Sequence, residues 1–579
     1  LTGSGDIVSG GSHFKTLTVS GVYSFADAMA VDGNLNLTAG SLEQGANLGV
    51  SGNYVQTGGT FTGSYLDAFT VGGSFSVPYG DGAFERYEEV DGVKIIRDLY
   101  DLQAMKSNLS SHFMLNASLD AISVASWNSN SGFDPIGDAT HAFTGNLNGN
   151  EKEISNLKLN RTASDYVALF GQIGVGGVVS NLALEEISVY GKDLVGGLAG
   201  LNRGSLSNVY TTGAFTVSGE NFVGGLVGEN QGSISNAYSS ARVKGNSHTG
   251  GLVGANSGTL DKTYGMGFIT DQTGQIPVSL TIGGLVGSGS GSVTNSYWDK
   301  EMTGQERSSG GTAGRVIHMI TDELGNLTVD PEDVADATSL DMMKSATYGG
   351  WDFGSTWVMD ENGTYPHFQF RYPEGVRGIW GKVLDESGTT PLDPNKQIGL
   401  YVSSTEGGVP GAPLMTTKTG ASSMFYFVMG NEDVRIQPTD FVVGGLMDPD
   451  YSGNTRMPAE TGSITNLDIW GHLTRVIPHP QPAPNIPVLI PIPMERIMSE
   501  VNRSLQDLMD GGGILAMLLG FWGVGGEIVI TEENPVMVVL DSEINKRADA
   551  LQKEVGISFD ANSQFGREQV PTRALITAG

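Results

Sequence analysis

The oxygen-bearing side chains of one short acidic segment have the spacing of a metal-binding loop. Asp448, Asp450 and Ser452 occupy positions 1, 3 and 5, and a glycine stands at position 6, as in a calcium loop. Position 12 is Ala459 instead of the glutamate that would bind calcium through two oxygens, and a proline follows the first aspartate. A plain polar turn is therefore the favoured interpretation, with calcium at these three residues as the alternative. A calcium titration followed by thermal melting distinguishes the two.

Three aspartates and four tyrosines stand at the edges of recurring segments. They are Asp193, Asp261 and Asp299, and Tyr210, Tyr238, Tyr264 and Tyr297. An acid–base pair for glycoside cleavage needs two carboxylates roughly 5 to 10 Å apart on one face, but these aspartates stand at different phases of the segments. The tyrosines could stack on sugar rings, although a packed aromatic stack is the favoured interpretation.

Motifs for other kinds of catalysis do not occur in the sequence. Its eight histidines are scattered and none begins a His-Glu-x-x-His zinc-protease motif, and neither a Gly-x-Ser-x-Gly elbow nor a phosphate-binding P-loop is found. The chain has no cysteine, which excludes disulfides, thiolate zinc sites and cysteine nucleophiles. We therefore expect a protein that is not an enzyme. We also expect it to bind no cofactor, with calcium as the one alternative.

The composition favours a large, mostly β protein. Glycine accounts for 84 of 579 residues and only 16% are charged, which predicts many turns and few long helices. A formal net charge of −31 argues against nucleic acid and anionic membranes as partners.

The chain opens in mid-pattern without a signal peptide, so we expect a mature or trimmed fragment. The apolar run 511–526 is shorter than the ~20 residues of a membrane-spanning helix, and we expect a buried core element rather than a membrane span.

A pattern of period two recurs over the first 80 residues. Each copy has a valine, a glycine two positions later and a larger side chain after two more: Val19/Gly21/Tyr23, Val31/Gly33/Leu35, Val50/Gly52/Tyr54 and Val71/Gly73/Phe75. This alternation predicts strands. The last two steps, of 19 and 21 residues, suit coils of a β-solenoid, and the glycines are expected at corners that need a positive φ.

A longer repeat covers the middle of the chain. Its four copies are DLVGGLAGLNRGSLSNVY (193–210), NFVGGLVGENQGSISNAY (221–238), SHTGGLVGANSGTLDKTY (247–264) and LTIGGLVGSGSGSVTNSY (280–297). They follow one another in steps of 28, 26 and 33 residues, and a degenerate copy over 165–182 precedes them. No copy has enough apolar surface to fold alone, so neighbouring copies must stack and share one core.

The alignment of the copies assigns a role to several rows of residues. The expected core row is Leu206, Ile234, Leu260 and Val293, and the expected ladder of side-chain amides is Asn208, Asn236 and Asn295, which Lys262 interrupts. Alternation also places Ile234, Asn236 and Tyr238 on one face of a strand. Glycine pairs such as Gly224-Gly225 let the next coil approach closely.

Two further groups are expected at the surface and at the end of the stack. The aromatic plug of the solenoid's end is expected from Trp298, Trp351 and Trp357. Recognition is expected on outward residues that differ between the copies, such as Arg203, Glu229 and Gln231.

These repeats resemble the GLUG repeats of large bacterial exoproteins of the filamentous haemagglutinin type, which are exported by two-partner or autotransporter routes. Two flanking segments strengthen the resemblance. Residues 91–161 are similar to a lead-in with a short helix, a polar pocket and a hairpin-like FTGNLNGN, and residues 349–370 are similar to segments that close such solenoids. The resemblance covers residues 1–372 and implies a right-handed parallel β-helix with a surface or adhesive role. None of the family's Asn-Pro secretion motifs is found, so the export route follows from the resemblance alone.

The sequence divides into five predicted segments. They are N-terminal β-helix coils (1–85), a GLUG-repeat β-helix (86–372), a prealbumin-like β-sandwich (373–477), a Pro-rich linker (478–493) and a C-terminal α+β module (494–579). In the sandwich, runs of period two around Ile379, Ile398 and Phe425 predict antiparallel strands. In the C-terminal module, two apolar stripes predict helices, and segments 527–530 and 536–540 predict a hairpin.

The leading hypothesis for function is a secreted bacterial cell-surface protein. A rigid β-solenoid would present a lateral face to a glycan or protein receptor on a host or neighbouring cell. Two alternatives stay open. One is a subunit that self-assembles into extracellular filaments or matrix through unpaired strand edges. The other is a carbohydrate-active β-helix enzyme with carboxylates clustered in a groove.

Overall fold

The chain divides into two compact units. A computed structural model describes residues 1–213, 216–277, 279, 281–307, 339–404, 412–433, 435–437, 439–447, 452–460 and 462–477, and the backbone of five short strands elsewhere. The first unit consists of Leu1–Met342 and Ala346–Asp352, and the second of Met343–Ser345 and Phe353–Gly579. The segment expected to close the solenoid therefore passes into the second unit at Phe353, while the boundaries of the five predicted segments stay predictions.

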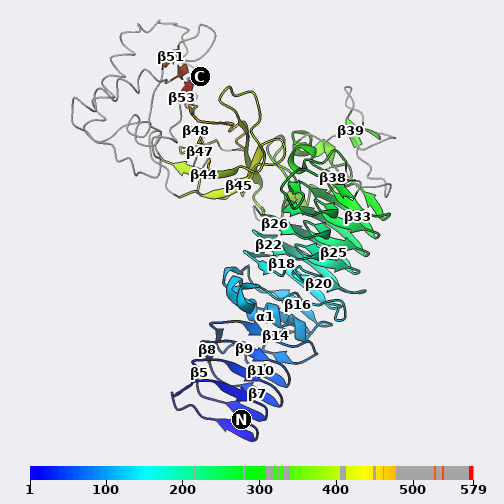
Figure 1. The fold of residues 1–579 in the computed structure, drawn as a ribbon, viewed down its shortest axis with the longest axis vertical. Coiled ribbons are helices and arrows are strands. Elements are labelled where there is room, and N and C mark those ends of the chain that lie inside the picture. The colour runs from blue at the N-terminus through cyan, green and yellow to red at the C-terminus, as the bar shows by residue number, and fades with distance from the viewer. Residues whose placement is uncertain are drawn as a thin grey trace, which may run out of the picture. The chain divides into compact units, whose positions relative to one another are not determined.

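Three parallel sheets build the first 85 residues (Figure 1). The first sheet contains β1 (Ser4–Ile7), β4 (Val22–Phe25), β7 (Ser41–Gln44), β10 (Thr60–Gly63) and β13 (Phe84–Glu85). The second contains β2 (His13–Phe14), β5 (Met29–Val31), β8 (Leu48–Val50) and β11 (Phe69–Val71), and the third β3 (Leu17–Val19), β6 (Leu35–Leu37), β9 (Tyr54–Gln56) and β12 (Phe75–Ser76). Each sheet takes one strand in three along the chain, so that three strands make one coil and successive coils stack.

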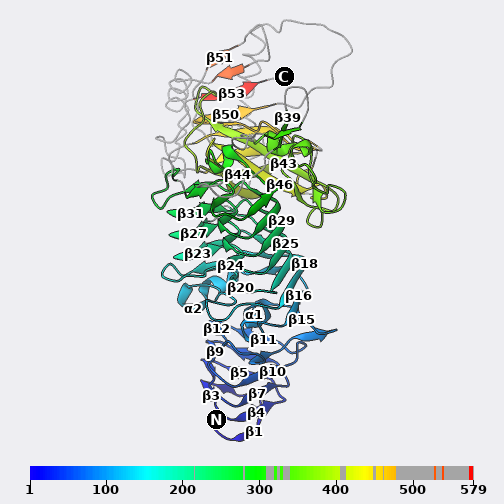
Figure 2. The same cartoon turned by 90° about the vertical axis from the view of Figure 1, so that its right-hand side faces the viewer.

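Four sheets continue this arrangement through the longer repeats (Figure 2). The largest contains β14 (Glu88–Val90), β15 (Val93–Ile96), β16 (His112–Leu115), β17 (Leu119–Asp120), β18 (Asn146–Ser155), β21 (Val178–Glu185), β25 (Ser205–Thr211), β29 (Ser233–Ser239), β33 (Thr259–Gly265), β37 (Ser292–Thr294) and β38 (Tyr297–Trp298). The second contains β19 (Lys158–Asn160), β22 (Ser188–Tyr190), β26 (Thr216–Ser218), β30 (Arg242–Lys244) and β34 (Ile269–Thr270). The others are β20 (Phe170–Ile173), β24 (Ala199–Asn202), β28 (Val227–Asn230), β32 (Val253–Asn256) and β36 (Val286–Ser288), and β23 (Asp193–Gly196), β27 (Asn221–Gly224), β31 (Ser247–Gly250) and β35 (Ile282–Gly283). The first unit is thus mostly β, with many parallel sheets in a β-helix-like arrangement.

The pairing register confirms the alignment of the long repeats. Gly196, Gly224, Gly250 and Gly283 are successive partners in neighbouring coils. The predicted core row, Leu206, Ile234, Leu260 and Val293, is also in register, and all four side chains are buried. One hydrophobic cluster runs from Ile7 to Trp298. The repeats therefore share a continuous core, as the sequence predicts.

The short N-terminal pattern is confirmed in three of its four copies. Val31, Val50 and Val71 pair in consecutive coils. Val19 pairs with Leu37 instead, so the first copy belongs to a different row. The step of 12 residues between the first two copies is too short for a coil, whereas the later steps match one coil each.

The glycines of this pattern are needed for a reason other than the predicted one. Gly33, Gly52 and Gly73 do not have a positive φ. A Cβ added at Gly52 would lie 2.6 Å from the carbonyl oxygen of Gly33, and one at Gly73 would lie 2.9 Å from that of Gly52. These glycines therefore permit close approach of consecutive coils, and the expectation of left-handed corners at them is wrong.

The helices of the described residues are short. They are α1 (Leu99–Ala104), η1 (Met105–Ser107), η2 (Ile122–Ser126), α2 (Trp127–Asn130), α3 (Lys300–Thr303), η3 (Asp341–Met343) and η4 (Ser345–Thr347). Helix α1 confirms the short helix expected in the lead-in segment. The hairpin-like FTGNLNGN is not a hairpin, because its residues begin β18, which pairs in parallel with β16 and β21.

The second unit contains two sheets that share one hydrophobic core. One sheet contains β43 (Val376–Leu384), β46 (Met424–Gly430) and β49 (Ile469–Trp470), and the other β44 (Gln397–Ser403), β45 (Met415–Lys418), β47 (Phe441–Leu446), β48 (Asn454–Pro458), β50 (Leu473–Val476), β51 (Glu527–Val529), β52 (Met537–Val539) and β53 (Arg573–Thr577). A short pair is formed by β41 (Trp357–Val358) with β42 (His367–Phe368); the other short pair, β39 (Met319–Thr321) with β40 (Leu327–Val329), belongs to the first unit. The predicted side chains Ile379, Ile398 and Phe425 are buried in this core.

In the second unit, the direction of strand pairing differs from the sequence prediction, whereas a predicted hairpin is present. The sheets are mixed rather than purely antiparallel, because β43 pairs with β49 and β48 with β50 in parallel. The predicted hairpin of residues 527–530 and 536–540 is confirmed by the antiparallel pair β51–β52. The Pro-rich linker 478–493, the apolar run 511–526 and the two predicted helical stripes lie outside the described residues. Within the part that is described, no helix is both long and apolar enough to cross a membrane.

Candidate functional site

The predicted calcium residues are only partly described. Asp448 and Asp450 lie outside the described residues, so calcium binding at Asp448, Asp450 and Ser452 stays a prediction. The carbonyl oxygen of Ser452 accepts a hydrogen bond of 2.5 Å from the backbone N–H of His472. Elsewhere in the described ranges, no group of three or more His, Asp or Glu side chains is arranged to hold a metal ion.

Asp193, Asp261 and Asp299 are not brought together. The carboxylate of Asp193 in β23 accepts hydrogen bonds from the backbone and side-chain N–H groups of Asn221 on the next coil (3.1 and 2.9 Å). Asp261 in β33 accepts two bonds from a threonine and an asparagine of the next coil (2.9 and 2.8 Å). Asp299 is fully buried and caps α3 by accepting a backbone N–H (2.9 Å). Each carboxylate therefore makes its own structural contact, and the three do not form an acid–base pair.

The tyrosine row is a packed stack. The ring centroids of Tyr210 and Tyr238 are 4.6 Å apart, those of Tyr238 and Tyr264 are 4.8 Å apart, and both pairs are within 4° of parallel. Tyr297 is in register with Tyr264. All four side chains are at most 2% exposed, so none offers a ring face to a sugar. The favoured interpretation from the sequence, an aromatic stack along the coils, is confirmed.

The predicted amide ladder is present and extends beyond the aligned repeats. Its bonds run from each side-chain N–H₂ to the amide oxygen of the previous coil: Asn236 to Asn208 (3.1 Å), Asn208 to Asn181 (2.9 Å) and Asn181 to Asn148 (3.1 Å). Lys262 interrupts it as expected, and Asn295 donates to Asp261 instead (2.8 Å). The ladder joins four consecutive coils at the surface of the unit.

The ladder residues lie at a bend in the strand. The φ angle is 52° at Asn208 and 45° at Asn236, a left-handed conformation that asparagine adopts more readily than most residues. Because of this bend, Ala237 joins the core together with Ile234, whereas Asn236 is only half-buried. The prediction that Ile234, Asn236 and Tyr238 share one face is therefore wrong.

A second amide ladder lies inside the core and escaped the sequence interpretation. Asn202 donates to Asn230 and Asn230 to Asn256, each over 2.8 Å, and the three side chains are at most 2% exposed. The signal is visible in the repeats as LNRG, ENQG and ANSG, where the fourth copy has SGSG. Gly289 takes the asparagine's place in that last coil, and the Asn256 Nδ2 atom has no partner among the described residues.

We expect Asn230→Ala to lower the free energy of unfolding by about 2 kcal/mol, because it removes the short hydrogen bonds of two buried amide groups. The amide oxygen of Asn256 loses its donor, and the N–H₂ of Asn202 keeps only a long hydrogen bond of 3.5 Å to the Ser233 carbonyl oxygen. Denaturant unfolding of the full chain measures the change. The exposed neighbour Gln231→Ala is the control, with an expected change within about 0.5 kcal/mol. Equal losses for the two variants would contradict a stabilising role of the buried ladder.

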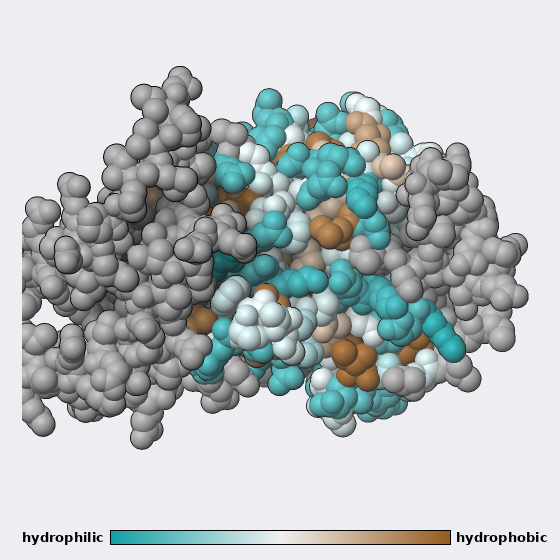
Figure 3. Space-filling view, turned by 90° about the horizontal axis from the view of Figure 1, so that it is seen from above, coloured by the Kyte–Doolittle hydropathy of each residue, from teal (hydrophilic) through white to brown (hydrophobic). Residues whose placement is uncertain are grey.

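The predicted variable residues of the lateral surface contact one another. The Arg203 Nε–H donates to the Gln231 side-chain oxygen (3.0 Å), and the Gln231 amide donates to Glu229 (2.7 Å). They form a polar chain across two coils on the outside of the unit. The described surface seen in Figure 3 is mostly hydrophilic, with hydrophobic residues in small separate patches.

Another outward row carries large side chains in an unfavourable backbone conformation. Tyr166, Leu194, Phe222 and His248 have φ angles of 60°, 57°, 55° and 50°, and all four are half-buried. Bulky residues rarely adopt these angles. Phe222 and His248 stack with ring centroids 4.6 Å apart. The row adds an apolar strip to the lateral surface, and the sequence repeats do not predict its backbone.

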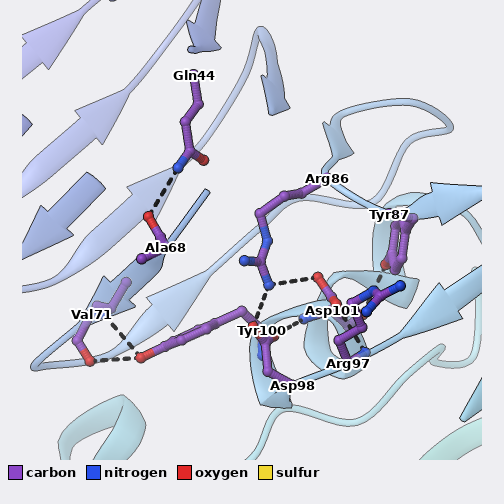
Figure 4. Close-up of polar contacts among 9 residues, drawn as sticks. All are labelled: Gln44, Ala68, Val71, Arg86, Tyr87, Arg97, Asp98, Tyr100 and Asp101. Carbon is purple, nitrogen blue, oxygen red and sulfur yellow. Dashed lines mark hydrogen bonds and ion pairs between the residues drawn. The ribbon is translucent and has the colours of Figure 1, made fainter. Parts of the chain in front are cut away.

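A buried ion cluster joins α1 to the N-terminal coils (Figure 4). One Nη atom of Arg86 contacts both Asp98 and, at 2.9 Å, Asp101. The side chains of Arg86 and Asp101 are 5% and 1% exposed. Asp101 also accepts the backbone N–H of Arg97 (3.0 Å), and Asp98 caps α1 through two N–H groups. Burial raises the pKa of the Asp101 carboxyl to about 6, while Arg86 acts to lower it.

Two of the three predicted plug tryptophans close the hydrophobic core of the first unit. Trp298 belongs to the core cluster, and its indole N–H donates to the Gln305 carbonyl (3.0 Å). Trp351 donates to the Asn295 carbonyl (3.0 Å) and lies against Tyr297. Trp357 belongs to the second unit, so its part in the plug stays a prediction.

The class of protein that this fold and these ladders define is a mostly β repeat protein with stacked parallel strands. A family model described as the GLUG motif matches residues 221–244. The chain is 36% identical over 214 residues to halomucin of Haloquadratum walsbyi, a match that covers 36% of this chain and 2% of halomucin. It is 46% identical over 81 residues to a Gly-rich membrane protein of Evansella cellulosilytica, covering 14% of this chain and 9% of that protein. The chain thus spans only a small part of either relative, and no solved structure matches it.

Proposed function

We propose that this chain is part of a secreted cell-surface protein whose first unit is a rigid, right-handed parallel β-helix with an adhesive lateral surface. The observation that carries the proposal is the parallel register of the repeats, in which the core and tyrosine rows continue through all four copies and the amide row joins the coils up to Asn236. Parallel crossovers are right-handed in the great majority of folds. Stacked coils extend a rigid surface without enlarging the core.

The relatives support a position at the cell surface. One relative is named a Gly-rich membrane protein, and the other is named halomucin. Membership of the filamentous haemagglutinin type, a bacterial source and export by a two-partner or autotransporter route belong to the same proposal. The proposal also includes a glycan or protein receptor on a neighbouring cell. The ladders and stacks hold the coils together without the outward residues, which are therefore free to vary and to bind a receptor.

We further propose that the protein is not an enzyme. The support is that the three aspartates considered for catalysis make separate structural contacts and the tyrosine row is buried. Self-assembly into filaments would use the same stacked coils, and calcium binding near Ser452 would be a separate property.

The cell-surface proposal is tested by labelling intact cells of the source organism with antibodies raised against the purified chain. We expect labelling without permeabilisation, or recovery of the protein from the medium. Treatment of intact cells with an added protease should remove the signal. An antibody against a cytoplasmic protein is the control, and labelling that appears only after permeabilisation would contradict the proposal.

A further inference from the structure

We infer that a groove on the side of the first unit binds a short neutral oligosaccharide. The groove has a volume of about 550 Å³, within the usual range for small-molecule sites. Its floor is formed by outward side chains of β19 and β22, and its wall by Ile122 and Ala125 of η2. This inference rests on the proposed adhesive function and specifies the kind of receptor.

The wall of the groove is held in place by Asp120. One carboxylate oxygen of Asp120 accepts the side-chain N–H of Asn156 (2.9 Å) and the backbone N–H of Ile122 (3.0 Å). Strand β17, which contains Asp120, pairs with the end of β18. The wall and the floor are thus connected by hydrogen bonds, and the groove is preformed rather than assembled by a ligand.

The groove combines apolar surface with polar groups that are free to bind. Ile122 is 65% exposed and Tyr190 is half-buried, so both present apolar surface to solvent. Lys158, Asn160 and Ser188 contribute an ammonium, an amide and a hydroxyl group. Within the described residues, none of these polar side chains makes a hydrogen bond or an ion pair, nor does the Tyr190 hydroxyl.

The repeat does not require a tyrosine at this place. In the pairing register, Tyr190 takes the same position as Asn160 in the coil before it and as Ser218 and Lys244 in the two coils after it. The aromatic ring of Tyr190 lines the groove together with Ile122 and Ala125 of η2. Its position is explained by the groove and not by stacking between coils.

A saccharide has the chemistry that this lining complements. The C–H face of a pyranose ring packs on an aromatic ring, while its hydroxyl groups bind amide, hydroxyl and ammonium groups. The groove contains one cationic and one acidic side chain, Lys158 and Glu186, and the chain as a whole has a net charge of −31. A neutral oligosaccharide therefore fits better than a polyanion, which long-range repulsion would disfavour.

Binding is tested with the full chain on an array of immobilised di- to hexasaccharides, both neutral and uronic-acid-containing. We expect retention of neutral members, which should be recovered uncleaved. In solution with the best-bound member, Tyr190→Ala should raise Kd about tenfold or more, whereas Tyr190→Phe should keep most of the affinity. Lys158→Ala should weaken binding, and its matched control Lys244→Ala, two coils away from Tyr190 in the same row, should not.

Several results would overturn the inference. They are no retained saccharide, retention of acidic members only, cleavage of the bound saccharide, or equal affinity of wild type and Tyr190→Ala. Thermal melting of each variant shows whether it is folded, and Tyr190→Phe gives the answer if Tyr190→Ala is unstable. Surface labelling of cells is independent of these measurements, so failure of the groove is distinguishable from failure of the proposed surface location.

Discussion

Gly232→Ala is expected to lower the free energy of unfolding of the first unit by about 3 kcal/mol or more. Gly204, Gly232 and Gly258 occupy equivalent corners of three successive coils. A Cβ at Gly232 would lie 2.1 Å from the carbonyl oxygen of Gly204, and one at Gly258 would lie 2.0 Å from that of Gly232. The same Gly204 oxygen accepts the backbone N–H of Ser233 (3.0 Å). The added methyl group therefore separates the coils and breaks hydrogen bonds between them.

Denaturant unfolding and hydrogen exchange measure this effect. Exchange should accelerate in peptides that cover β28 and β29, on either side of the substituted corner, because the inter-coil bonds there are weakened. Gly49→Ala is the matched control, since a Cβ there would meet only the Thr70 hydroxyl at 3.5 Å. That variant should be neutral or slightly stabilised, by up to about 1 kcal/mol. A similar loss in both variants would mean that close approach between coils is not why glycine is needed.

The rows of the repeat could be predicted because every copy contributes the same residue type at the same position. The positions of Leu206, of Ile234 and of the tyrosine near the end of each of these strands follow directly from the alignment. The buried ladder of Asn202 and Asn230 carried the same kind of signal, but it was hidden by the variable residue on each side of it. The pairing register between stacked coils is predictable from the repeats when invariant polar positions are aligned as well as apolar ones.

Backbone conformation was less accessible from the sequence. Glycine can mean a positive φ or a lack of space, and alignment does not distinguish the two, so the reason for Gly52 was mistaken. The positive φ of Asn236 breaks the period of two, and this is why alternation placed the neighbouring side chains incorrectly. Phe222 and His248 have the same kind of φ without being residues that favour it.

The particular residue contacts between segments that do not repeat could not be predicted. The groove beside Tyr190 depends on η2, which belongs to a single coil, and on a hydrogen bond between Asp120 and Asn156. The ion cluster of Arg86 and Asp101 joins a coil to a helix that occurs once. Such sites depend on three-dimensional proximity of residues with no periodic signal, so they emerge only from the structure.

The second large effect is expected for Arg86→Met, which should lower the free energy of unfolding by about 3 to 5 kcal/mol at neutral pH. The substitution removes the positive charge that faces two carboxylates, and Asp101 is 1% exposed. Methionine fills a similar volume, so most of the loss comes from the uncompensated buried charge and not from a cavity. Denaturant unfolding of the full chain measures the difference from the wild type.

The loss caused by Arg86→Met should depend on pH in a defined direction. Burial raises the pKa of Asp101 from its ordinary 3.8 to about 6. The folded chain therefore binds more protons at Asp101 than the unfolded chain between these values. Its contribution to stability is full below pH 3.8 and is lost as pH rises through 6. Without Arg86, whose charge lowers this pKa, the pKa rises further. The loss should thus be largest near pH 8 and smaller near pH 5, where protonation removes the buried charge.

Lys94→Met is the matched control for charge. Lys94 forms an ion pair with Glu85 in the same part of the chain, and these side chains are 14% and 29% exposed. Because solvent screens this pair more strongly, its loss should cost about 1 kcal/mol or less. Comparing each variant with the wild type at the same pH removes the general effect of acid on a chain of net charge −31. If the loss for Arg86→Met is equal at both pH values, Asp101 is not the group that the arginine stabilises, and packing of Arg86 over the Phe69 ring becomes the better explanation.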